Sequence, residues 1–268
     1  MPCLPNETLD SITDFLHDNP GALKQLCIVS WSRVPRAQMH LFYDVRFEKY
    51  EDLRNWKKIF QEPAKSPARY TNSLSFCVTK SFCREDVGWI KSFNRVVRLA
   101  VVDNRYMPGS TENHSFTPFH ELSPAIKSLH MGWETTPLKP VFDLIYSFPF
   151  LEDLSVLNSQ RSSYDGPKSY QPLVLPRFTG TLVLGNLGSL FISQLLKLPN
   201  QHQLHFRKIV WKCIANCQYS VLNDLVESCS GTLESVDIGC CKLCLFDLYQ
   251  HVISGTVSDW VSVHSSWH

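Results

Sequence analysis

The chain of 268 residues lacks an excess of charge of either sign. It has 26 Lys and Arg against 25 Asp and Glu, a formal net charge of +1, and no basic run is longer than two residues, as at Lys57-Lys58. A balanced charge gives no global field that would attract a polyanion or an anionic membrane. We therefore expect neither nucleic acid nor a membrane as a partner.

The sequence also lacks targeting and catalytic patterns. No charged segment followed by an apolar run opens the chain, so we expect no secretory signal. The uncharged stretch 178–196 is interrupted by Gly180, Gly185 and Gly188, and predicts a buried strand, a turn and a helix in place of a membrane span. No phosphate-binding loop, nucleophile elbow or His-Glu-x-x-His motif is present. We expect no enzyme and no cofactor; an α/β enzyme, the alternative, would show a deep polar pocket.

Ten cysteines in a chain without a secretory signal indicate reduced, buried thiols in a cytoplasmic or nuclear protein. The spacings Cys213–Cys217 and Cys241–Cys244 are ones that a zinc site uses. The segment between the two pairs is slightly long for a zinc ribbon. We expect no metal, with zinc as the alternative.

The first residues predict an amphipathic helix. Four acids share one face: Glu7, Asp10, Asp14 and Asp18. The opposite face is apolar: Leu9, Ile12 and Leu16. We expect the acidic face to lie in water and the apolar face to contact another surface. Asn19-Pro20 predicts an N-cap and the first residue of a second helix. Two such helices bury too little apolar surface to be stable alone.

The spacing of these residues resembles the F-box motif. It has Leu4-Pro5 with Glu7, then Ile12 and Leu16, and Val29-Ser30 closing the second helix. Three further pieces are similar to the variant common in large fungal F-box families: Pro35-Arg36-Ala37, His40-Leu41-Phe42 and Val45-Arg46-Phe47. The resemblance covers residues 3–45 closely and continues more weakly to about residue 245. One departure is that Trp31 and Arg33 exchange the positions of the usual Val-Ser-Arg-x-Trp pattern. Another three-helix bundle is the alternative.

The resemblance implies a substrate-recognition adaptor of a cullin–RING (SCF-type) ubiquitin ligase. The motif would dock on a Skp-type adaptor, and through it on the cullin complex, while other subunits do the chemistry and a client protein of unknown identity binds elsewhere. The implied adaptor-binding residues are Leu4, Pro5, Glu7, Leu9, Ile12, Leu16, Leu23, Val29 and Ser30. The alternative is an interaction scaffold without a ligase, whose N-terminal helices cap the body and bury Leu9, Ile12 and Leu16 against residues 50–76; in the docking case these three residues are exposed in the free protein.

Short apolar triplets recur after the first 70 residues, at spacings of 25 to 30 residues. They are Leu74–Phe76, Leu99–Val101, Leu129–Met131, Leu154–Val156, Leu182–Leu184, Ile209–Trp211 and Val236–Ile238. Helical spacing in Val141–Phe148 and Val221–Ser228 suits the return connections. Such a period is typical of leucine-rich repeats, in which each repeat adds one strand to a parallel sheet. We expect an α/β chain with a small helical F-box module and an irregular leucine-rich-repeat-like solenoid; another α/β fold is the alternative.

The texture of the sequence divides the chain. We expect a helical module over 1–62, including a helix at Tyr50–Phe60, and a proline-containing linker over 63–73. The repeat domain spans 74–244, with inserted loops at 104–121 and 159–177, and an atypical tail covers 245–268. No strand pattern is apparent in the tail. We expect it to leave the strand at Val236–Ile238 as an edge of the sheet.

Overall fold

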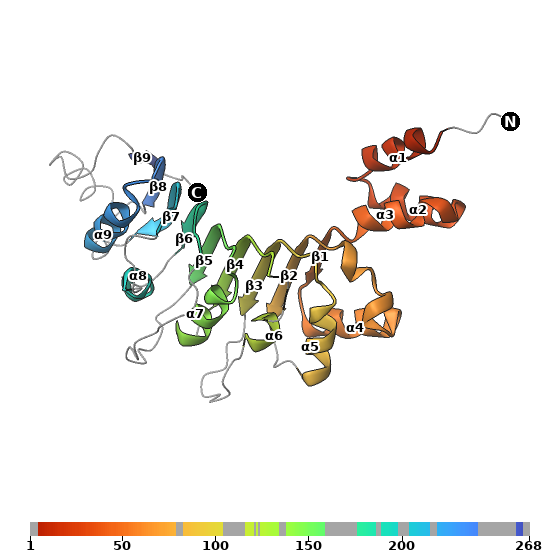
Figure 1. Cartoon of the computed structure of the whole chain (residues 1–268), viewed down its shortest axis with the longest axis horizontal. Helices are drawn as coiled ribbons and strands as arrows, with labels where there is room; N and C mark the ends of the chain where they lie inside the picture. Colours follow the sequence, from red (N-terminus) through yellow and green to blue (C-terminus); the bar gives the residue numbers. More distant parts are fainter. Residues whose placement is uncertain are drawn as a thin grey trace.

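A computed structural model describes residues 5–78, 83–103, 116–120, 122, 124–133, 138–158, 176–185, 189–197, 204–214, 219–240 and 261–264. Within these residues the protein is a mixed α/β structure with one nine-stranded sheet, in which every strand is parallel to its neighbours and the spatial order follows the chain order. Figure 1 shows the sheet as an arch, with helices along its outer side and three further helices beyond its first strand.

The strands are short. They are β1 (Asp44–Phe47), β2 (Ser73–Val78), β3 (Arg98–Asp103), β4 (Ser128–Trp133), β5 (Asp153–Asn158), β6 (Thr181–Leu184), β7 (Lys208–Ile214), β8 (Ser235–Cys240) and β9 (Val261–His264). The helices are α1 (Asn6–Phe15), α2 (Pro20–Val29), α3 (Val34–Leu41), α4 (Tyr50–Phe60), α5 (Arg84–Lys91), α6 (Thr117–His120), α7 (Leu138–Tyr146), α8 (Ser189–Leu196) and α9 (Tyr219–Cys229). Short 3-10 turns lie at Trp31–Arg33, Pro63–Lys65 and Pro67–Tyr70.

All seven strands predicted from the apolar triplets are present, as β2 to β8. In each triplet the outer two residues point to the helix-covered face; Leu74 and Phe76 of β2 are both buried there. The helices predicted at Tyr50–Phe60, Val141–Phe148 and Val221–Ser228 are α4, α7 and α9. The stretch 178–196 contains β6 and then α8, as its glycines predicted. The alternation of apolar residues was therefore a sound signal for this sheet.

The connections between strands repeat the same hydrogen bonds. The amides of Asn72 and Ser73 both donate to the carbonyl of Tyr43, and those of Val97 and Arg98 both donate to that of Asn72. The amides of Lys127 and Ser128 likewise both donate to the carbonyl of Val97. The carbonyls of Lys127, Gly180 and Arg207 each accept from two consecutive amides in the same way. The residues at the start of each of these strands are thus hydrogen-bonded to the residue just before the preceding strand, which keeps successive strands in register.

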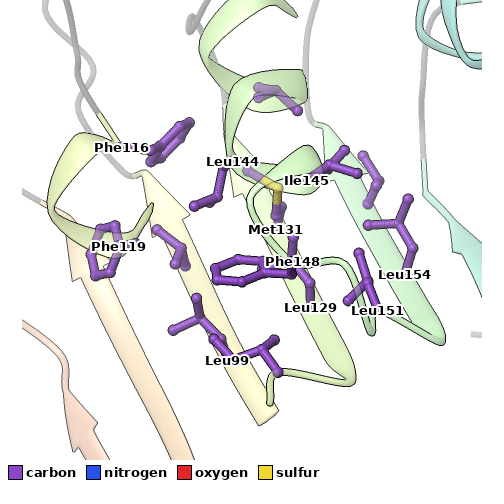
Figure 2. Packing of buried hydrophobic residues seen from close by; sticks show 14 of the residues in the cluster. Leu99, Phe116, Phe119, Leu129, Met131, Leu144, Ile145, Phe148, Leu151 and Leu154 are labelled. Atoms are coloured by element: carbon purple, nitrogen blue, oxygen red, sulfur yellow. The ribbon is translucent and has the colours of Figure 1, made fainter. Parts of the chain in front are cut away.

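The core lies between the sheet and the outer helices. Figure 2 shows Leu99, Leu129 and Leu154 from three neighbouring strands beneath Leu144, Ile145 and Phe148 from α7 and the turn after it. All six are buried, as are Phe116 and Phe119 at α6. The part of the 104–121 segment that the structure describes is thus a short helix with a buried ring. One continuous apolar cluster runs from Val45 to Ile238.

The N-terminal border of this body differs from the expected division. Strand β1 pairs with β2, and Trp56 of α4 packs edge-on against Phe47 and close to Phe93. The sequence had placed β1 and α4 in the helical module; the structure packs both with the sheet. The expected linker 63–73 contains two 3-10 turns, and Ala68 there is buried.

At the other end, the expectation that residues 245–268 add no strand is wrong. Strand β9 pairs in parallel with β8 through the register Val236↔Val261 to Gly239↔His264. Two valines at alternate positions, Val261 and Val263, carry the apolar-x-apolar pattern there. Residues 241–260, which precede these valines, mix apolar and polar side chains, and no strand and helix pair was recognised there, so the two valines were not assigned to a strand. Residues 245–260 lie outside the described residues, so the connection to β9 is not described.

Candidate functional site

The three N-terminal helices are joined by polar contacts. Arg33, only 7% exposed, lies between α1 and α3. Its Nη1 donates to Asp10 Oδ1 at 2.6 Å, and its Nη2 donates to Asn6 Oδ1 at 2.7 Å. Charge-assisted bonds of this kind are the stronger hydrogen bonds of proteins. Arg33 therefore fastens the first turns of α1 to the rest of the module.

A second contact holds the end of α1. Arg36 donates from both Nε and Nη2 to the Asp14 carboxylate, and His40 Nε2 lies 2.8 Å from Asp14 Oδ1. The hydrogen bonds from Arg36 and then from His40 hold the pKa of Asp14 well below its usual range. Asp14, the last acid of α1, is thus ionised and paired down to strongly acidic pH.

These contacts correct the expectation that the acidic face of α1 lies in water. Asp10 pairs with Arg33 in the turn before α3, and Asp14 pairs with Arg36 of α3, whereas Glu7 and Asp18 are exposed. Helical periodicity defines a face but not what the face meets. The cations that pair with the acidic face of α1 come from residues 33 to 40, more than 20 positions further along the chain.

The predicted adaptor-binding residues fall into three groups. Pro5, Glu7, Ile12 and Val29 are exposed. Leu9, Leu16 and Ser30 are half-buried, with the Ser30 hydroxyl 3.1 Å from that of Ser32. Leu23 is completely buried inside the module and offers nothing to a partner. Leu4 lies outside the described residues.

The module exposes more apolar surface than the sequence predicted. We call the following the N-terminal apolar side chains, with their exposed fractions: Ile12 45%, Phe15 84%, Ile28 73%, Val29 73% and Trp31 89%. Phe15, Ile28 and Trp31 were missed. Trp31 is on the surface because Arg33 occupies the interior position, so the exchanged Trp and Arg of the sequence were the signal that could have found it.

Other candidate chemistry is not supported in the described residues. There, no group of three or more His, Cys, Asp and Glu is placed to hold a metal ion, and no helix is long and apolar enough to cross a membrane. Cys217, Cys241 and Cys244 of the possible zinc site lie outside the described residues. Of the cysteines described as free thiols, Cys229 is buried but Cys83 is exposed, so not every thiol is a core residue.

Comparison with known proteins adds no assignment. No family model, no curated protein and no solved structure matches this chain.

Proposed function

We propose that the chain is a substrate-recognition adaptor of an SCF-type ubiquitin ligase. In this proposal α1 to α3 are an F-box that docks on a Skp-type adaptor, and the sheet with its outer helices is an irregular leucine-rich-repeat-like solenoid that binds a client protein. The observation that carries the proposal is the set of N-terminal apolar side chains: five large apolar residues from Ile12 to Trp31 are exposed to water.

Exposed rings and branched aliphatics at this density favour a partner. Burying one such side chain completely contributes about 1.5–3 kcal/mol, and Trp is enriched in binding hot spots. In the body, by contrast, the exposed large apolar residues among the described ones are scattered singly, at Tyr43, Ile59 and Phe150. Single exposed apolar residues are ordinary on soluble proteins.

The exposure of Ile12 also bears on the scaffold alternative. If the helices only capped the body, Leu9, Ile12 and Leu16 would be buried against residues 50–76. Ile12 is 45% exposed, Leu9 and Leu16 are half-buried, and α1 makes its closest element contacts with α3 and not with the body. This observation favours docking over capping. The repeated entry hydrogen bonds and the chain-order parallel sheet support the repeat part of the proposal.

The test is co-expression of the full chain with a Skp-type adaptor, followed by calorimetry. We expect a stoichiometric complex. Phe15→Ser and Trp31→Ser should each weaken it by about tenfold or more, as loss of a hot-spot ring does. Changing Leu4 and Pro5 together to Ala should weaken it by roughly 2–4 kcal/mol.

Ile59→Ser is the matched control, because Ile59 is also largely exposed, at 70%, but lies on α4 of the body. It should leave affinity unchanged. Absence of a complex with the unmodified chain, or equal affinity for the Phe15→Ser, Trp31→Ser and Ile59→Ser variants, would contradict the proposal.

A further inference from the structure

One face of the sheet carries none of the helices that the structure describes (Figure 1). On each strand the residues that alternate with the core residues point to this open face, which lines the inner side of the arch in Figure 1. The register aligns one row across its middle: Arg46, Ser75, Ala100, His130, Ser155, Val183, Val210 and Asp237. From Ser75 to Val210 every side chain but that of His130 is small. An extended segment can therefore approach the sheet closely there.

The acids of the open face are already engaged. Arg46 pairs with Asp44 at 2.8 Å, and Lys208 pairs with Asp237 at 2.6 Å. Asp153 Oδ1 accepts a hydrogen bond from the Thr181 amide at 2.6 Å. Asp153 therefore has a neutral partner, and the carboxylates of this face that pair with a cation are Asp44 and Asp237.

Two cations of the same face have no carboxylate partner among the described residues. Arg98 opens β3 and is exposed, with its guanidinium 5.8 Å from the centre of the Tyr43 ring. Lys212 is exposed on β7, where its neighbours Ile209 and Trp211 mark the opposite, buried face. Among the described residues the open face thus has four cations, at Arg46, Arg98, Lys208 and Lys212, against three carboxylates, at Asp44, Asp153 and Asp237, which is an excess of one positive charge.

Lys212 of β7 and His130 of β4 share the open face. Burial and, next, the charge of Lys212 lower the pKa of His130, although β4 and β7 are three strands apart. The His130 Nδ1 lies 2.8 Å from the Ser155 hydroxyl. Lys212, His130 and Ser155 thus place polar groups toward the same inner region, with Arg98 on the neighbouring strand β3.

We propose that the open face between Arg98 and Lys212 binds an extended acidic segment of a protein. The proposal rests on the proposed function in taking that protein to be the client. Guanidinium and ammonium groups bind carboxylates through charge-assisted hydrogen bonds, and complementary charge also guides encounter. Strands about 4.8 Å apart put β3 and β7 about 19 Å from each other. The register sets Arg98 two residues before, and Lys212 two residues after, the same row of the sheet, so these two positions lie about 23 Å apart, a distance that about seven extended residues span.

The experiment uses the full chain without any adaptor, so its outcome is independent of docking by the N-terminal helices. The probe is a fluorescein-labelled peptide of alternating Glu and Ser, long enough to cross β3 to β7, followed by anisotropy. A peptide of alternating Lys and Ser is the charge-reversed control. We expect saturable binding of the Glu peptide only. The double variant Arg98→Gln/Lys212→Gln should weaken it by about tenfold or more.

The matched control is Lys58→Gln/Lys197→Gln, which removes two exposed cations from α4 and from the residue after α8. It should bind the Glu peptide like the unmodified chain. Equal loss in both double variants would overturn the proposal, and so would an absence of saturable binding. Stronger binding of a single-stranded oligonucleotide of equal charge, lost in the Arg98→Gln/Lys212→Gln variant, would assign the face to nucleic acid and also overturn it.

Discussion

The N-terminal module, residues 5–42, and the body that begins at β1 are held together by different forces. In the body, one apolar cluster runs under the whole sheet and includes rings such as Phe76, Phe93 and Trp211. In the module, the residue that α1 buries is Thr13, and the helix is fastened by Arg33, Arg36 and His40. The body therefore depends on burial, and the attachment of α1 depends on charge.

Because ion pairs attach α1, the stability of its attachment does not depend on burying its apolar surface, and that surface stays available to a partner. A helix that buries little of its apolar surface in its own chain keeps that surface for a partner, while ion pairs fix its orientation. A core side chain in the body has no such freedom, because its contacts are what keeps the sheet folded. Changes in the two regions should consequently differ in size and in the condition that reveals them.

The largest contrast is between two phenylalanines. Phe76 is buried, stacks on Phe47 and lies against Phe119. We expect Phe76→Ala to lower the free energy of unfolding by about 3–5 kcal/mol, since it removes a large core side chain. Phe15→Ala should change it by less than about 0.5 kcal/mol, because the ring is exposed. Urea unfolding followed by circular dichroism measures both. Similar losses would contradict the division.

A buried charge should have the next largest effect. Asp86 is fully buried; Lys57 Nζ lies 3.0 Å from its Oδ1, and the Cys83 amide donates to its Oδ2 at 2.8 Å. Burial raises the pKa of Asp86, but the bonds from Cys83 and Lys57 outweigh it, so the pKa lies below the ordinary value. Asp86→Ala should lower the free energy of unfolding by about 3 kcal/mol, because the ammonium group of Lys57 loses its buried partner. Urea unfolding measures this change.

The control is the neighbouring Glu85→Gln, which removes the exposed partner of the same ammonium group. This change should lower the free energy of unfolding by less than about 1 kcal/mol. If Asp86→Ala costs no more than Glu85→Gln, the α4–α5 contact is not held by the buried pair.

A smaller and local effect is expected in the module. Arg33→Ala removes two charge-assisted bonds, and we expect it to reduce the stability of the α1 contact by about 2 kcal/mol. Hydrogen exchange should accelerate in α1 while β2 to β5 keep their protection. Arg46→Ala, which removes an exposed ion pair of β1, is the control and should alter neither region. Equal acceleration of the body would show that the module is not a separate unit.

The smallest expected effect depends on pH. Asp14 has a lowered pKa in the folded chain, so its pairing stabilises α1 at every pH above the unfolded value of about 3.9 and is lost as the pH falls through the folded value. The carboxylate is partly exposed, so the effect is less than about 1 kcal/mol. Exchange in α1 should accelerate between neutral pH and pH 3 after correction for intrinsic rates. Asp14→Asn should remove most of that change; an identical change in the variant would assign it elsewhere.

Local pattern predicted much of the body. The seven strands β2 to β8 and the helices α4, α7 and α9 follow from apolar alternation and helical spacing, because a residue facing a core must be apolar wherever the core lies. Asn19 was predicted as an N-cap, and its side chain accepts the Ala22 amide at 3.0 Å. These features depend on neighbours within a few positions, which is the range that a sequence pattern covers.

What the sequence determined by itself was therefore which segments become strands and helices, and which side of each strand is buried. The tertiary structure alone decided what the acidic face of α1 meets, that Arg33 takes the interior and sends Trp31 to the surface, and that Arg98 and Lys212 share one open face. These outcomes depend on partners that lie 20 to more than 100 residues away. Which side chains form an ion pair, and which ring stays exposed, depends on the surfaces that the packed core brings together. The periodicity of neighbouring residues in the sequence contains no information on these surfaces.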